Sequence, residues 1–211
     1  MSVFFVTGLP RSRTAWLANL LCVPPASLCV HDIVGGCAGI ADLQEQVERL
    51  EGGRLEGRLG TEASPYQASP YRKVGVSDPL LALVWEDVVD AWPEAKWVVL
   101  RRERRAAERS FGGFLARLGA PPALPMDLEP WELALDALEC QAETRALAWE
   151  GLDDAEMVAG VCDWLRLPFR RERFEMLRRM NVQTIPERAP FDWRAAPFEH
   201  WLNERKEKSW A

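Results

Sequence analysis

Short apolar runs alternate with amphipathic segments along most of the chain, and this alternation restricts the fold more than any other feature of the sequence. Strands are expected at 2–7, 28–31, 73–77, 96–101 and 145–149. Helices are expected at 14–22, 42–50, 80–92, 103–118, 131–143, 154–165 and 171–179. Short apolar strands separated by helices form parallel sheets covered on both faces. The sequence therefore predicts an α/β fold, a parallel sheet of about five strands with helices on both faces.

The predicted elements fit one domain of residues 1–211. With 211 residues, of which 48% are hydrophobic, the chain can bury one substantial core. Two stretches carry no element pattern: 52–72, which contains SPYQASPY, and 119–130, which contains four prolines. Both are expected to be long surface loops, the first a flexible one. The tail from residue 181, rich in proline and aromatic residues, is expected to cross the surface of the body.

Net charge and cysteine content limit which ligands the protein can bind and where it is expected to be located. The formal net charge of −6 gives no general attraction to nucleic acid or to an anionic membrane, so an anionic ligand must meet a local cluster of positive charge. The five cysteines form no CxxC pair, as expected for reduced thiols of a cytosolic protein. The first residues lack a basic segment, and their apolar run is too short for a signal peptide or membrane span. The chain is therefore expected to be cytoplasmic.

The stretch GLPRSRT joins the first strand, which ends near Gly8, to the first helix. In a parallel sheet such a loop presents backbone N–H groups and the positive end of a helix dipole to an anion. Ser12 and Thr14 add hydroxyl groups, and Arg11 and Arg13 add charge. The pattern predicts a phosphate or sulfate site, although it lacks the second glycine and the lysine of GxxxxGK(S/T). The alternative is an ordinary turn whose arginines face water.

A second basic segment, KWVVLRRERRAAERSF, covers residues 96–111. Its strand brings Arg101 and Arg102 to the same edge of the sheet as the first loop. Ser110 follows Arg102 by eight residues, roughly 12 Å along a helix, so both can reach a large ligand with separated anionic groups. The alternative is a solvated basic helix face.

Together these two motifs resemble those of the sulfotransferase family. The family's first motif, of the form PRSGT or PKSGT, binds the 5′-phosphosulfate end of 3′-phosphoadenosine 5′-phosphosulfate (PAPS), and its second binds the 3′-phosphate through an arginine and a serine. DAWPEAKWVVLRR and LAWEGLDDAEMVAGVCDWLRLPF are similar to two further family segments. The resemblance covers most of residues 3–178 in the family's order, and it implies a fold of the P-loop nucleotide-kinase type.

The resemblance implies a donor site and a chemistry. The implied donor-binding residues are Gly8, Pro10, Arg11, Ser12, Arg13, Thr14, Trp16, Arg102 and Ser110. Arg11 would act in catalysis by contacting the sulfuryl group and the bridging oxygen. Trp16 would pack beside the nucleotide, and Arg102 would take the 3′-phosphate with Ser110. Sulfuryl transfer mainly requires alignment and stabilisation of charge on the leaving oxygens, so no metal is expected.

Arg13 departs from the family pattern, because a glycine stands at this position in the motif. If the position requires a positive φ, an arginine there costs on the order of 1 kcal/mol or more. Arg13 therefore either adds a contact to the donor or marks a donor site that has been lost. The glycine-rich nucleotide motif near the C-terminus of cytosolic members is not found, so adenine recognition is not assigned.

An acceptor hydroxyl must lose a proton during transfer, and His31 is the first candidate for the catalytic base. It follows a strand-like run and would emerge at the carboxyl edge of the sheet, where Asp32 could orient it. The alternative is a histidine satisfied by hydrogen bonds in a loop. Asp78 and Glu86 are further candidates by position.

The expected function is transfer of a sulfuryl group from PAPS to a hydroxyl or amine of a small-molecule acceptor. The expected partner is that acceptor alone, with neither nucleic acid nor membrane, and a homodimer is compatible with it. One alternative is a P-loop kinase for a small molecule or nucleotide, in which Asp32 at the end of LCVHD would hold Mg²⁺. The other is a non-catalytic binding protein on the same fold.

Overall fold

A computed structural model describes residues 2–52, 71–117, 127–180 and 197–208 of the chain. Most of the two expected loops, 52–72 and 119–130, and the first part of the tail from 181 lie outside the described residues. Among the helices that are described, none is long and apolar enough to cross a membrane. All five cysteines are free, and burial raises the pKa of Cys37 to about 12 and that of Cys162 to about 11.

The centre of the molecule is a five-stranded sheet in which every neighbouring pair is parallel. Its strands, in spatial order, are β2 (Ser27–His31), β3 (Lys73–Ser77), β1 (Ser2–Gly8), β4 (Lys96–Arg101) and β5 (Thr144–Ala148). The chain leaves the central strand β1 for one edge, returns through β3, and then crosses to β4 on the other side. In open parallel sheets, ligands bind at the carboxyl ends of the strands where the connections diverge in this way.

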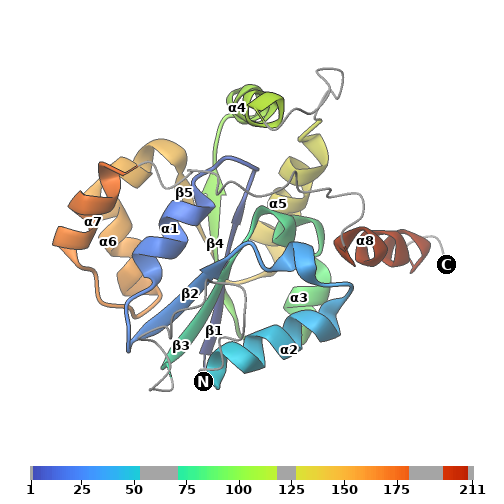
Figure 1. Cartoon of the computed structure of the whole chain (residues 1–211), viewed down its shortest axis with the longest axis horizontal. Helices are drawn as coiled ribbons and strands as arrows, with labels where there is room; N and C mark the ends of the chain where they lie inside the picture. The colour runs from blue at the N-terminus through green and yellow to red at the C-terminus, as the bar shows by residue number, and fades with distance from the viewer. Residues whose placement is uncertain (1, 53–70, 118–126, 181–196, 209–211) are drawn as a thin grey trace.

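Helices cover both faces of the sheet, which confirms the predicted α/β architecture (Figure 1). One face carries α1 (Thr14–Leu21), α6 (Ala155–Trp164) and α7 (Arg171–Arg178). The other carries α2 (Ile40–Glu51), α3 (Trp85–Ala91), α5 (Glu129–Gln141) and α8 (Pro197–Lys208). Alternate residues of β1 serve the two layers: Phe4 and Val6 pack toward α1, whereas Phe5 packs in the opposite layer.

The remaining elements lie near the ends of the strands. Three short 3₁₀ segments, η1 (Val34–Gly36), η2 (Pro79–Leu83) and η3 (Trp149–Asp153), follow β2, β3 and β5. The helix α4 (Arg104–Arg117) follows β4 and projects from the sheet edge at the top of Figure 1. Only Ala107 of α4 is buried, so few core contacts hold this helix.

Two elements differ from the sequence prediction. The helix expected at 80–92 is split into η2 and α3, because Asp78 and Pro79 start a 3₁₀ turn and the backbone at Val84 leaves the helical region before α3 begins. The tail contains the helix α8, whose Phe198 and Trp201 are buried in the core layer of α2 and α3. The prolines that precede 198–202 obscured its short apolar spacing in the sequence.

Candidate anion-binding site

The loop between β1 and α1 wraps tightly against β4. A Cβ atom at Gly8 would lie 2.6 Å from the carbonyl oxygen of Leu100, so only glycine allows β1 and β4 to approach this closely here. Beyond it, Arg11 and Arg13 have φ angles of 69° and 66°, and the amide of Ser12 donates to Leu9 O at 3.1 Å. Anion-binding nests are built from consecutive residues of opposite backbone hand, and left-handed residues at positions 11 and 13 are the feature that this loop shares with them.

The N-terminus of α1 has no cap from the described part of the protein. Arg13 stands at its N-cap position, where its side chain makes no capping hydrogen bond, and the first turn holds no acidic residue. The Ser12 side chain is fully buried, and its Oγ has no hydrogen-bond partner among the described residues. Helix starts are normally satisfied by a side-chain acceptor, and buried hydroxyl groups are normally bonded. An anion seated at α1 would supply the missing acceptors.

Arg102 reaches this loop from the end of β4. Its Nη1 donates to Arg11 O, and its guanidinium lies 4.9 Å from the centre of the Trp149 ring. The preceding residue, Arg101, points to the other side of the strand, where it donates to Glu139 and Asp136 of α5, both at 2.7 Å. Of the two arginines expected at the strand end, the structure therefore brings only Arg102 to the loop.

Positive charge is concentrated around Arg11. Burial lowers the pKa of Arg11, and the nearby Arg117 and Arg102 lower it further by repulsion. Its guanidinium lies 4.7 Å from the centre of the Phe114 ring on α4. An arginine stays charged under these conditions, so an anion bound here would relieve the repulsion between these guanidinium groups.

Arg13 is directed away from this cluster toward η3. Its Nη1 donates to Asp153 Oδ1 at 2.9 Å, and its guanidinium lies 4.6 Å from the Trp16 ring centre and 5.8 Å from that of Trp149. Position 13 does have the positive φ at which an arginine is strained. These three contacts offset that strain.

His31 and Thr14 meet at the carboxyl edge. The His31 Nε2 lies 3.2 Å from Thr14 Oγ1, and Ser77 Oγ donates to Thr14 O at 3.0 Å. His31 is exposed at this edge, yet the protein packed around its ring lowers its pKa, and the charge of Asp32 opposes this by raising it. No hydrogen bond joins Asp32 to His31 within the described part of the chain. The lowered pKa favours the neutral form of this imidazole.

Asp78 and Glu86, the other base candidates, have different surroundings. Asp78 is 1% exposed, and its carboxylate accepts from Leu80 N at 2.9 Å and Val34 N at 3.1 Å, which ties η2 to η1. Burial, and then the charge of Asp32, raise the pKa of Asp78 to about 7. Glu86 is exposed on α3 and pairs with Arg205 of α8.

Comparison with known proteins gives a result for the fold only. No family model and no curated protein matches the sequence. Among solved structures, a sulfotransferase from Alicyclobacillus acidocaldarius superimposes with a TM-score of 0.55 and 16% identity, over 84% of this chain and 90% of that one. The chain has the sulfotransferase fold. Sulfotransferase STF9 from Mycobacterium avium has a TM-score of 0.47 and 13% identity, over 98% of this chain and 75% of that one.

Within this sulfotransferase fold, Trp16 does not lie where the motif resemblance placed it. Its side chain is 1% exposed, its Nε1 donates to Leu177 O at 2.9 Å, and its ring meets Phe174 edge-on. Trp16 is therefore part of the core beneath Arg13, rather than a surface on which a nucleotide could pack. Its spacing within an amphipathic helix was compatible with either place.

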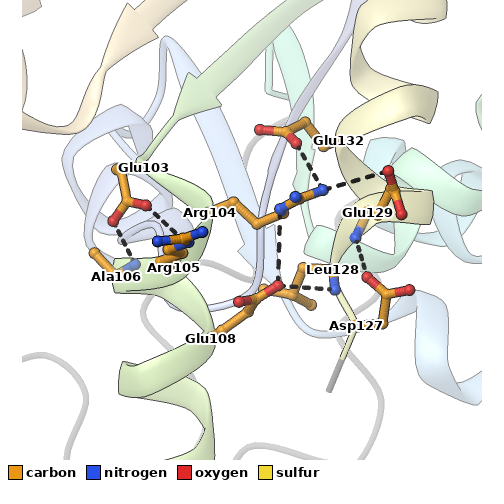
Figure 2. A network of polar contacts seen from close by, with 9 residues as sticks. All are labelled: Glu103, Arg104, Arg105, Ala106, Glu108, Asp127, Leu128, Glu129 and Glu132. Atoms are coloured by element: carbon orange, nitrogen blue, oxygen red, sulfur yellow. Dashed lines mark hydrogen bonds and ion pairs between the residues drawn. The ribbon is translucent and has the colours of Figure 1, made fainter. Parts of the chain in front are cut away.

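Ser110 lies on α4, away from the first turn of that helix. Figure 2 shows why the first turn is closed to ligands: the Glu103 carboxylate accepts from Arg105 N at 2.8 Å and from Ala106 N at 2.6 Å. In the same view Arg104 joins α4 to α5 through Glu132 at 3.2 Å. Ser110 forms no hydrogen bond to Arg102 or to the loop in the described residues.

Three residues near the loop were not singled out from the sequence: Phe114, Trp149 and Asp153. Phe114 lies just beyond the second basic segment, and the other two lie in LAWEGLDD, which the motif resemblance had marked only as a whole. Their contacts join positions far apart in the chain, and Arg13 and Asp153 are 140 residues apart. No local spacing reveals a pair of this kind.

Proposed function

We propose that this protein transfers a sulfuryl group from PAPS to a hydroxyl or amine of a small-molecule acceptor. The observation that carries the proposal is the uncapped N-terminus of α1, with the buried Ser12 hydroxyl beside it, which has no partner among the described residues. Arg11 and Arg102 meet at this point. The same arrangement within a sulfotransferase fold supports a site for an anionic donor at the carboxyl edge of the sheet.

The residues of the loop fit the anionic groups of such a donor. Ser12, Thr14 and the backbone N–H groups at the start of α1 would hold the 5′-phosphate. Arg11 would contact the sulfuryl group and the bridging oxygen, and Arg102 would take the 3′-phosphate with Ser110. A guanidinium binds such oxygens with two parallel hydrogen bonds, which is both stronger and more directional than the contact of an ammonium.

In the proposed reaction the acceptor oxygen or nitrogen attacks sulfur, and the bond between sulfur and the bridging phosphate oxygen breaks. Adenosine 3′,5′-bisphosphate leaves with the negative charge, which Arg11 and the α1 N–H groups would stabilise. His31 would receive the proton of the acceptor. Its lowered pKa favours the neutral imidazole, which is the form that a base requires.

Calorimetric titration of adenosine 3′,5′-bisphosphate into chelator-treated protein tests the proposal. We expect micromolar binding by the wild type, and a loss of at least about 30-fold in Arg11→Ala and in Arg102→Ala, since each removes a charge-assisted contact. Arg105→Ala is the matched control: it removes the same charge from the same segment, and the exposed Arg105 side chain makes no contact with the loop as the structure describes it. It should bind like the wild type.

The alternatives predict other outcomes of the same titration. A kinase would bind ATP with Mg²⁺ and would bind the bisphosphate weakly in chelator. A non-catalytic binding protein would take up neither nucleotide. If the wild type binds the bisphosphate, transfer of radiolabelled sulfuryl from PAPS to a panel of hydroxyl and amine compounds, again in chelator, tests the catalytic part.

A further inference from the structure

We propose that the Arg13 side chain is a positioning element rather than a ligand of the donor. It holds the β1–α1 loop in its anion-binding shape by anchoring the loop to η3. The inference rests on the proposed function, because the affinity of the loop for an anion is the property that Arg13 would control. It replaces both interpretations of the sequence, in which Arg13 is either an added donor contact or a sign of lost function.

The contacts of Arg13 leave little of its guanidinium for a ligand. The edge of the group donates to Asp153 Oδ1 at 2.9 Å, and its surroundings include the Trp16 and Trp149 rings at 4.6 and 5.8 Å. Only 14% of the side chain is exposed. These partners belong to the core beneath α1 and to η3. The group is therefore occupied by protein, with its charge matched by a carboxylate.

The anchor forms part of a closed path that starts and ends in the loop. From Arg13 the path reaches Trp149, whose ring centre is also 4.9 Å from the Arg102 guanidinium. Arg102 in turn donates to Arg11 O, which returns the path to the loop. The two ends of the path, Arg11 and Arg13, are the two loop residues with a positive φ. The path thus fixes both backbone positions that shape the nest.

An anchor is needed here because the residue is not glycine. Glycine adopts positive φ without strain, whereas a side chain is held there only when its surroundings determine it. Fixing the N–H groups before the ligand arrives lowers the entropy lost on binding and so raises affinity. In this chain the contacts of Arg13 would hold the positive φ that a glycine adopts without strain.

Asp153→Ala separates the two roles of Arg13, because they predict changes of opposite sign. If Arg13 were a donor ligand, removal of Asp153 would free its charge, and the bisphosphate would bind more tightly. If Arg13 is a positioning residue, the loop loses its anchor, and we expect affinity to fall about 5-fold. Asp154→Asn is the matched control, since it removes the neighbouring charge, keeps the α6 cap and leaves the Arg13–Asp153 pair in place. It should change affinity less than about 2-fold.

Arg13→Lys and Arg13→Ala provide the second comparison, because alanine removes the anchor but, unlike glycine, keeps the strain of a positive φ. Lysine keeps the charge but loses the planar group that packs among the rings and bonds Asp153. We therefore expect both variants to lose affinity about equally, by roughly 10-fold. Retention of affinity by Arg13→Lys, together with a loss in Arg13→Ala, would show that the charge itself binds the donor and would overturn the proposal.

Hydrogen exchange in the free protein tests the anchor without any ligand. Amides of residues 9–16 should exchange about tenfold faster in Asp153→Ala and Arg13→Ala than in the wild type, and at the wild-type rate in Asp154→Asn. Unchanged exchange in Asp153→Ala and Arg13→Ala would overturn the proposal. If the wild type fails to bind the bisphosphate while this pattern holds, the proposed function fails and the anchor stands.

Discussion

The helices α1 and α4 both start at the carboxyl edge of the sheet, after adjacent strands, yet their first turns are satisfied in different ways. At α4 the protein supplies its own acceptor, because Glu103 binds Arg105 N and Ala106 N. At α1 no described side chain does so, and a buried hydroxyl there also lacks a partner. The difference indicates that a helix start can bind an anionic ligand where no carboxylate of the protein caps it and arginines lie close by.

Giving α1 a carboxylate of its own should remove the difference. In Ser12→Asp the new side chain would occupy the N–H groups and neutralise Arg11, so we expect the affinity for adenosine 3′,5′-bisphosphate to fall at least about 100-fold. Calorimetry measures it, and thermal unfolding checks that the variant is folded. Ser12→Ala should lose only about 5-fold, since one neutral hydrogen bond is removed. Binding by Ser12→Asp at nearly wild-type strength would contradict the assignment of the site.

Asp78, at the start of η2, is the buried carboxylate of this edge and should make stability depend on pH. Its pKa is raised from 3.8 to about 7, so in this range the folded protein keeps a proton that the unfolded chain releases. Its contribution to stability is full at low pH and is lost as pH rises through about 7. From about pH 5 to pH 7 we expect it to lower the free energy of unfolding by on the order of 2 kcal/mol.

Urea unfolding of the wild type and Asp78→Asn across this range measures the effect of Asp78. The neighbouring His31 acts in the opposite sense, because its lowered pKa makes the folded state lose stability as pH falls below the ordinary value of 6.5. Since His31 is present in both proteins, the difference between their curves isolates Asp78. Parallel curves would show that Asp78 does not titrate between these limits.

The helix α6 offers a purely structural cap for comparison. Asp154 accepts from Glu156 N at 2.8 Å and Met157 N at 3.3 Å. Asp154→Ala should lower the free energy of unfolding by about 1 kcal/mol, and the Tm by about 3 °C, without changing bisphosphate affinity. Asp163→Ala, at the other end of the same helix, should not destabilise it. A fall in affinity in Asp154→Ala would mean that α6 also takes part in the site.

The charge of Glu103, at the start of α4, should have a small effect on anion binding at Arg102. Glu103 lies near Arg102 and favours its charged form, so it opposes an anion at that arginine. Glu103→Gln keeps one acceptor for the helix start and removes the charge, and we expect bisphosphate to bind about 2-fold more tightly at low salt. The gain should shrink as salt is added. Glu129→Gln, whose charge faces Arg104, is the control and should show no gain.

Much of the fold follows from local sequence. Each of the five strands begins and ends within one residue of its predicted position. For β1, β3 and β4 the reason is that parallel strands buried on both faces read as continuous apolar runs. The loop was predicted in part, because seven consecutive residues, GLPRSRT, indicate a turn after Gly8 that leads into a helix. The direction of Arg13 and the burial of Trp16 were not, since each depends on partners supplied by η3 and α7.

The positive φ of Arg13 has a consequence for how relatives of this chain would diverge. Its anchor, Asp153, is 140 residues away, so the residue types at the two positions depend on each other although the sequence around neither of them indicates this. In a lineage with glycine at position 13, position 153 can change to other residue types. In a lineage that keeps the arginine, we expect an acidic residue to be kept at position 153. A search pattern that demands the glycine would pass over every descendant of the second kind.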